Sequence, residues 1–204
     1  HVVEVDGDTA TFFYWDGHPT TTVFLKHWVF GLSSTVEFQR IPHTDAFYLF
    51  LDLPKRARVE YKLEVVRGGT GQWTQDPLNK NLARDPFGAN SVAHGTGYEI
   101  PEWIHPNPDA PRGHRDQIWI DSKTFGRREF GLYIPARFQR TRHYPLLVVH
   151  DGHDYLRYAS LGTVLDNLIH GLEIADCICV FTTSPDRLHE YADDERHARF
   201  LTEE

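Results

Sequence analysis

The sequence has little cysteine, no dense basic cluster and no long apolar run. Two of its 204 residues are cysteine, Cys177 and Cys179, and they lie two apart in an apolar stretch. Neighbours two apart on a strand point to the same face, and such close spacing speaks against a structural disulfide. We therefore expect both cysteines to be core residues, in a reduced, cytoplasmic setting.

The charge and hydropathy patterns exclude two classes of partner. The net charge is -8, with 21 Lys and Arg against 29 Asp and Glu, so a polyanion would repel the chain. No apolar run approaches the roughly 20 residues that a membrane-spanning helix needs, and no segment resembles a signal peptide. Because His1 is not a natural start, we expect an upstream segment to have been lost. We expect no nucleic acid, no membrane and no cofactor; a small molecule or a carbohydrate fits better.

The first half of the chain has the pattern of an all-β domain. Short runs of β-branched and aromatic residues alternate with turn residues, with hardly any helical periodicity. From Arg58 to Val65 the apolar residues fall on alternate positions, which is typical of a strand with one buried face. The predicted strands are 10–15, 21–26, 35–39, 46–53 and 58–66. Their spacing predicts an immunoglobulin-like β-sandwich over residues 1–99.

The second half has a different pattern. Four prolines, Pro101, Pro106, Pro108 and Pro111, make residues 100–115 a predicted interdomain linker. A hairpin of 117–120 and 128–134 is then followed by a strand at 145–150, a helix at 161–172, a strand at 177–181 and a helix from about 194. Strand and helix in alternation predict a mostly parallel α/β sheet over residues 116–204. The last helix reaches Glu204 in mid-pattern, so we expect this domain to be incomplete.

Polar residues follow the first buried strand of this predicted sheet. Ligands of open α/β sheets bind beyond the carboxyl ends of the strands, and we expect Gly152 to lie at such an end, on a central strand. A glycine there lets backbone N–H groups face a developing negative charge, as an oxyanion hole requires. A plain strand-exit turn is the alternative. A zinc site formed by His150, Asp151, His153 and Asp154 is a weaker alternative, because a strand exit scatters these side chains.

Two further motifs bear on the chemistry. Ser160 stands in a Tyr-Ala-Ser-Leu-Gly context, where a nucleophile elbow requires glycine in place of Tyr158, and no buried strand precedes it. We expect Ser160 to be a helix N-cap or a first-turn residue. In the loop after the second buried strand, Arg187 could bind an anionic substrate group or organise the site through Glu190; a salt bridge within the loop is the plainer reading.

Several motifs, in this order, resemble those of the esterase D-like α/β hydrolases. The chain is similar to enterochelin esterases and their relatives, in which an immunoglobulin-like domain precedes the hydrolase domain. The segment Trp73 to Asn79 resembles the end of such sandwich domains, including those of glycogen-active enzymes. The other motifs are Ser122 to Arg128, Tyr133-Ile134-Pro135, Tyr144 to Gly152, and Arg187 through Glu190-Tyr191 to Phe200.

The resemblance implies a serine nucleophile, a histidine base and an acidic partner that form an acyl-enzyme at an ester carbonyl. Of these parts only the oxyanion donor carries over, to the backbone of Gly152 or His153. The serine, the acid and the histidine would follow Glu204, so we expect the chain alone to be inactive.

The same resemblance implies a small-molecule ester as partner. Members of the family hydrolyse esters of catecholate siderophores, which makes a ferric siderophore one expected substrate. Asp151, Arg187, Glu190 and Tyr191 are the substrate-binding candidates, and a homodimer is the assembly considered.

The sandwich has two readings of its own. Exposed Trp15, Trp28 and Trp73 would make it a carbohydrate-binding module attached to a carbohydrate-ester esterase, although buried aromatic residues are more frequent. The reading we favour is that the sandwich shapes the esterase cleft and a dimer contact.

Overall fold

The structure is a computed structural model that describes residues 3–29 and 31–204. It is mostly sheet with few helices, and it divides into two compact units, His1–Ile100 and Pro101–Glu204. In the part of the chain that is described, no helix is long and apolar enough to cross a bilayer.

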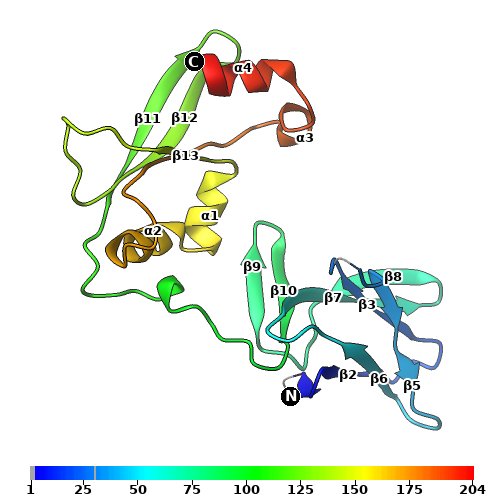
Figure 1. Cartoon of the computed structure of the whole chain (residues 1–204). Coiled ribbons are helices and arrows are strands. Elements are labelled where there is room, and N and C mark those ends of the chain that lie inside the picture. The colour runs from blue at the N-terminus through cyan, green and yellow to red at the C-terminus, as the bar shows by residue number, and fades with distance from the viewer. Residues whose placement is uncertain (1–2, 30) are drawn as a thin grey trace. The chain divides into compact units, whose positions relative to one another are not determined.

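The first unit consists of two antiparallel sheets (Figure 1). One has the strand order β1 (Glu4–Asp6), β2 (Thr9–Trp15), β6 (Ala46–Asp52) and β5 (Gln39–Arg40). The other has the order β4 (Thr35–Glu37), β3 (Thr22–His27), β7 (Arg58–Arg67), β10 (Gly88–His94) and β9 (Leu82–Asp85), with β8 (Thr70–Thr74) paired to β7. Four of the five predicted strands are confirmed to within two residues, and the fifth, 35–39, is divided between β4 and β5.

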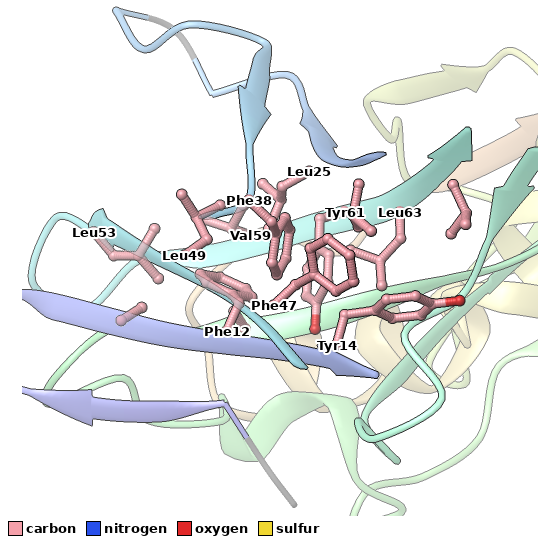
Figure 2. Close-up of a cluster of buried hydrophobic side chains, with 14 residues drawn as sticks. Phe12, Tyr14, Leu25, Phe38, Phe47, Leu49, Leu53, Val59, Tyr61 and Leu63 are labelled. Carbon is pink, nitrogen blue, oxygen red and sulfur yellow. The ribbon is translucent and has the colours of Figure 1, made fainter. Parts of the chain in front are cut away.

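The core of this unit lies between the two sheets. On β7, Val59, Tyr61, Leu63 and Val65 are buried while the residues between them are not, as the alternation predicts. Figure 2 shows these side chains meeting those of β2, β3 and β6, with Phe12 packed edge-on to Tyr61. Aromatic and aliphatic burial on this scale is the main source of the unit's stability.

The segment that follows β8 is fixed by a buried polar network. The Tyr61 hydroxyl donates to Asp76 Oδ2 at 2.6 Å and accepts from Asn79 Nδ2 at 3.0 Å. Asn79 also donates to the Val92 carbonyl, and the Asp76 N–H donates to Ser91 Oγ. Burial, with the charge of Asp76, raises the pKa of Tyr61, so the phenol stays protonated. The Asp-Pro-Leu-Asn motif is therefore a structural device of the first unit.

Replacing Tyr61 by Phe should lower the free energy of unfolding by about 1–3 kcal/mol, because Asp76 Oδ2 would lose its donor inside the core. Urea denaturation of the chain would measure it. The matched control is Tyr48→Phe: its hydroxyl donates to Gln39 at the surface, and its loss should cost less than about 0.5 kcal/mol. Equal costs for the two variants would contradict a special role for the buried network.

The second unit holds one sheet and its helices. The sheet has the order β11 (His114–Ser122), β12 (Gly126–Ile134), β14 (Ile178–Phe181) and β13 (Leu146–Val149). Only β13 and β14 are parallel; β12 pairs antiparallel with both β11 and β14. The prediction of a mostly parallel sheet is therefore wrong for this part of the chain, because the long β11–β12 hairpin supplies half of the strands. Among the described residues β13 lies at the edge of the sheet, so the prediction that Gly152 follows a central strand is wrong for this part of the chain.

The helices of the second unit are η1 (Glu102–Ile104), α1 (Gly152–Tyr158), α2 (Leu161–His170), α3 (Arg187–Glu190) and α4 (Glu195–Glu203). The predicted helices at 161–172 and from 194 are confirmed as α2 and α4, and α4 begins where Asp194 Oδ1 accepts the Arg196 N–H. Ser160 is the N-cap residue of α2, as predicted, although its side chain makes no capping hydrogen bond. Helix α1 was not predicted, because its seven residues are too few for a clear periodicity.

The proline-rich segment is bound to α2. Asn167 Nδ2 donates to the carbonyls of Trp103 and His105, at 2.7 and 2.8 Å. Asp166 Oδ1 accepts from the Gly113 N–H at 2.7 Å and from the Tyr133 hydroxyl at 2.9 Å. Much of the segment predicted as a linker is thus tied to the second unit.

Replacing Asp166 by Ala should release the segment at Gly113 and leave the buried Tyr133 hydroxyl without its acceptor, at a cost of about 1–3 kcal/mol. Hydrogen–deuterium exchange should then be faster at Gly113, while exchange in β7 stays unchanged. Asp166→Asn, which keeps the Oδ1 acceptor, is the control and should retain most of the protection. Unchanged exchange at Gly113 in the Ala variant would contradict this account.

Candidate functional site

The candidate site lies at the carboxyl ends of β13 and β14. Residue 149 of β13 is opposite residue 181 of β14, so both strands end at the same edge of the sheet. Figure 1 shows α1 beginning where β13 ends. Both segments singled out from the sequence, 150–155 and 182–191, therefore belong to one edge.

The turn between β13 and α1 is fixed by close packing on β14. Asp151 has a left-handed backbone with φ 51°, and Gly152 then begins the helix. A Cβ added at Gly152 would lie 2.5 Å from the Phe181 Cα, so only glycine fits. The Gly152 N–H donates to the Thr182 carbonyl at 2.9 Å. Gly152 is required for this contact, and its N–H is already engaged.

The next amide, that of His153, is in a different position. The N–H groups of Asp154 and Tyr155 donate to the Asp151 carbonyl at 2.9 and 3.3 Å. The His153 N–H makes no hydrogen bond to any described residue, as is usual for an amide in a first helical turn. Of the two oxyanion candidates from the sequence, His153 is therefore the one with a free donor.

Arg187 binds the same turn. Its guanidinium lies 3.1 Å from Asp151 Oδ2, with the two side chains 49% and 26% exposed. The alternative that Arg187 organises the site through Glu190 is wrong, because the ion pair runs to Asp151 on the preceding loop. Two of the predicted substrate-binding residues are thus bound to each other, which fixes α3 against the β13–α1 turn.

Glu190 is held by a strand that the sequence did not connect with the site. Its Oε1 accepts from Arg128 of β12 at 2.7 Å, and both side chains are nearly buried. A buried, hydrogen-bonded ion pair of this kind is costly to break from one side. Glu190 therefore anchors the loop after β14 to the sheet.

Three rings meet beside Glu190. The centroid of His150 lies 4.9 Å from that of Tyr191 and 5.3 Å from that of His197, and Tyr191 lies 5.2 Å from His197. They line a hollow of about 390 Å³ whose other walls come largely from the start of α4. His150 Nδ1 is also 3.2 Å from Thr182 Oγ1.

Several polar atoms in this cluster are buried without a hydrogen-bond partner among the described residues. They are Arg128 Nε, the Tyr191 hydroxyl and both ring nitrogens of His197. His197 Nδ1 is 3.8 Å from Glu190 Oε2, too far for a hydrogen bond. Burial, with the neighbouring His150, lowers the pKa of His197, while burial and the charge of Asp151 raise the pKa of Tyr191. Both groups therefore favour their neutral forms near pH 7.

The weaker alternatives from the sequence gain no support. In residues 3–29 and 31–204, no group of three His, Cys, Asp or Glu side chains could hold a metal ion, and the four residues of the zinc reading form no such set. Ser160 follows a helix instead of a strand and makes no side-chain hydrogen bond to a histidine in that part of the chain. Cys177 and Cys179 are buried and unpaired, and burial raises the pKa of Cys179 to about 12.

Sequence reasoning missed Arg128, Thr182 and His197 as members of this site. Arg128 appeared as part of a hairpin, and His197 as part of a terminal helix. A charged residue in a strand next to a glycine turn, and a histidine on the apolar side of a helix, were the available signals. Neither signal says which distant loop the side chain meets.

Comparison with known proteins relates the second unit to a family of esterases. Residues 122–203 match the model of the family described as "Putative esterase". A comparison of the sequence with curated proteins found no match.

Three solved structures of esterases have a similar fold. The enterochelin esterase of Shigella flexneri is 18% identical, with a TM-score of 0.66 over 99% of this chain and 60% of that one. The ferric enterobactin esterase of Salmonella typhimurium is 17% identical, with a TM-score of 0.71 over 96% and 59%. The Shigella flexneri enterobactin esterase in the presence of enterobactin is 19% identical, with a TM-score of 0.68 over 96% and 58%.

The chain thus spans about 60% of the length of these esterases. At such identities the likeness shows the fold, and the family match covers most of the second unit. Residues 122–203 are therefore similar to the esterase family, in a chain whose fold is similar to that of the enterochelin esterases.

Proposed function

We propose that this chain is the front part of a serine ester hydrolase of the enterochelin esterase type. The observation that carries the proposal is the N–H of His153, which lies in the first turn of α1, just after β13, and makes no hydrogen bond to any described residue. In an acyl-transfer site, such a donor would stabilise the oxyanion that forms when a nucleophile attacks the ester carbonyl. In this proposal Gly152 packs against Phe181, and the Arg187–Asp151 ion pair holds the turn between β13 and α1.

In this proposal the first unit is an immunoglobulin-like β-sandwich and the second is the beginning of an α/β-hydrolase sheet. The edge strand β13 supports the second part. Leu146, Leu147 and Val148 are exposed, Leu146 to 63%, on a strand whose outer edge pairs with no described residue. An apolar strand of this kind belongs inside a sheet, so further strands would cover it.

The serine, acid and histidine of the reaction would follow Glu204, and the chain alone would be inactive. This is consistent with the absence of a serine–histidine hydrogen bond in residues 3–29 and 31–204. The substrate would be a small carboxylic ester in the cytoplasm, with the ester of a ferric catecholate siderophore as the specific candidate and a homodimer as the assembly. A structurally similar esterase was solved in the presence of enterobactin, which supports this candidate substrate.

The location of the nucleophile can be tested by labelling. The 204-residue chain and a version extended at its C-terminus to the length of the esterases it resembles would be treated with a fluorophosphonate probe. We expect one labelled serine in the extended protein, beyond residue 204, and no labelling of the shorter chain. Labelling of Ser160 in either protein would refute this arrangement.

The oxyanion donor can be tested in the extended protein by removing one N–H. His153→Pro deletes the amide proton in a first helical turn, where proline is tolerated, and Gly152 has no Cβ to clash with the ring. We expect kcat for a p-nitrophenyl ester to fall by about 10²–10³-fold. His153→Ala, which keeps the N–H, should stay within a few-fold of the parent. If both variants lose activity equally, the imidazole and not the amide is the important group.

A further inference from the structure

We propose that Trp28 and Trp73, in the first unit, form a binding site for a neutral oligosaccharide. The two indoles are 71% and 48% exposed. Their ring centroids lie 6.1 Å apart with the planes inclined at 45°. Two large aromatic faces that meet at an angle and remain open to solvent form the two walls of an apolar corner. The proposal is independent of the esterase reaction.

The corner is built at one sheet of the first unit. Trp73, on β8, is opposite Glu64 of β7, which in turn is opposite Phe24 of β3. Trp28 directly follows the end of β3, at His27. β3 and β8 both pair with β7, so one sheet positions Trp73 and the residue before Trp28.

Hydrogen-bonding groups surround the rings. Lys26 Nζ is 5.9 Å from the centroid of Trp73, 2.8 Å from Glu64 Oε2 and 3.1 Å from Thr35 Oγ1. Lys62 is opposite Lys26 in the strand register, on the same outward face. Donors and acceptors thus lie around an apolar surface.

The charges decide the class of ligand. Lys26 and Glu64 neutralise each other in a 2.8 Å ion pair, so the ion pair beside Trp73 carries no net charge. A pyranose has the matching chemistry, because its C–H face stacks on an indole while its equatorial hydroxyls reach donors and acceptors at the rim. An anionic ligand would have to compete with Glu64 for the ammonium group.

The third tryptophan considered from the sequence does not belong to this site. Trp15 is on β2, in the other sheet of the first unit, and is 66% exposed. No aromatic ring packs on it in the described part of the chain. It is therefore the matched control, equally exposed but isolated.

Isothermal titration calorimetry of the whole 204-residue chain would test the site. The probes are maltoheptaose, cellohexaose and chitohexaose. We expect binding of at least one of them, weakened about tenfold or more by Trp73→Ala and by Trp28→Ala, since removal of one stacking ring from a small site is costly. Trp15→Ala should bind like the parent, and Trp73→Phe should retain part of the affinity.

Thermal unfolding of each variant would verify the fold. If Trp73→Ala unfolds, Trp28→Ala decides, because residue 28 lies outside the strands. Absence of binding to all three probes would overturn the proposal, as would equal weakening by Trp15→Ala. 2,3-Dihydroxybenzoate is the aromatic control probe. If it binds to the parent and not to Trp73→Ala, while no sugar binds to the parent, the proposal is also overturned.

Discussion

The contact between Gly152 and the end of β14 is the constraint on which the candidate site depends. Because no Cβ fits beside Phe181 and the Gly152 amide is bound to the Thr182 carbonyl, α1 must start at one position relative to β14. The left-handed turn at Asp151 follows from that start, and the next N–H without a partner among the described residues is that of His153. A glycine that looks catalytic in the sequence thus acts by packing, and its effect is to place its neighbour.

Two ion pairs extend this constraint to the loop after β14. Arg187 reaches back to Asp151, and Glu190 reaches across to Arg128 of β12. Each pair joins elements that are far apart in the sequence, and together they leave α3 little freedom. Three of the four residues proposed from the sequence as substrate ligands are therefore used in holding the site, and Tyr191 is the one whose polar atom has no partner among the described residues.

The sequence predicted what depends on local patterns. Alternation along 58–66 and helical spacing along 161–172 identified β7 and α2 because burial of one face imposes those periods. It failed where partners come from elsewhere. The position of β13 in the sheet, and the direction of the strands beside it, depend on which strands pair. The Arg128–Glu190 contact joins two residues that are 62 positions apart in the sequence. The helix α1 is too short to show the helical periodicity of apolar residues from which it could have been predicted. The edge of the sheet that carries the site could thus be predicted, but not the arrangement of its side chains.

Two buried polar clusters in the described part of the chain differ in how far their hydrogen bonds are satisfied. In the first unit, Tyr61, Asp76 and Asn79 satisfy one another, as a network selected for stability does. Beside Glu190, the Tyr191 hydroxyl and both nitrogens of His197 are buried without partners among the described residues. Each such group costs about 1–3 kcal/mol in a folded protein, so a cluster of them is not explained by stability. Water, a substrate or a neighbouring segment would supply the missing hydrogen bonds. The polar walls of the hollow at the end of β13 are therefore the part of the candidate site whose hydrogen bonds are incomplete among the described residues.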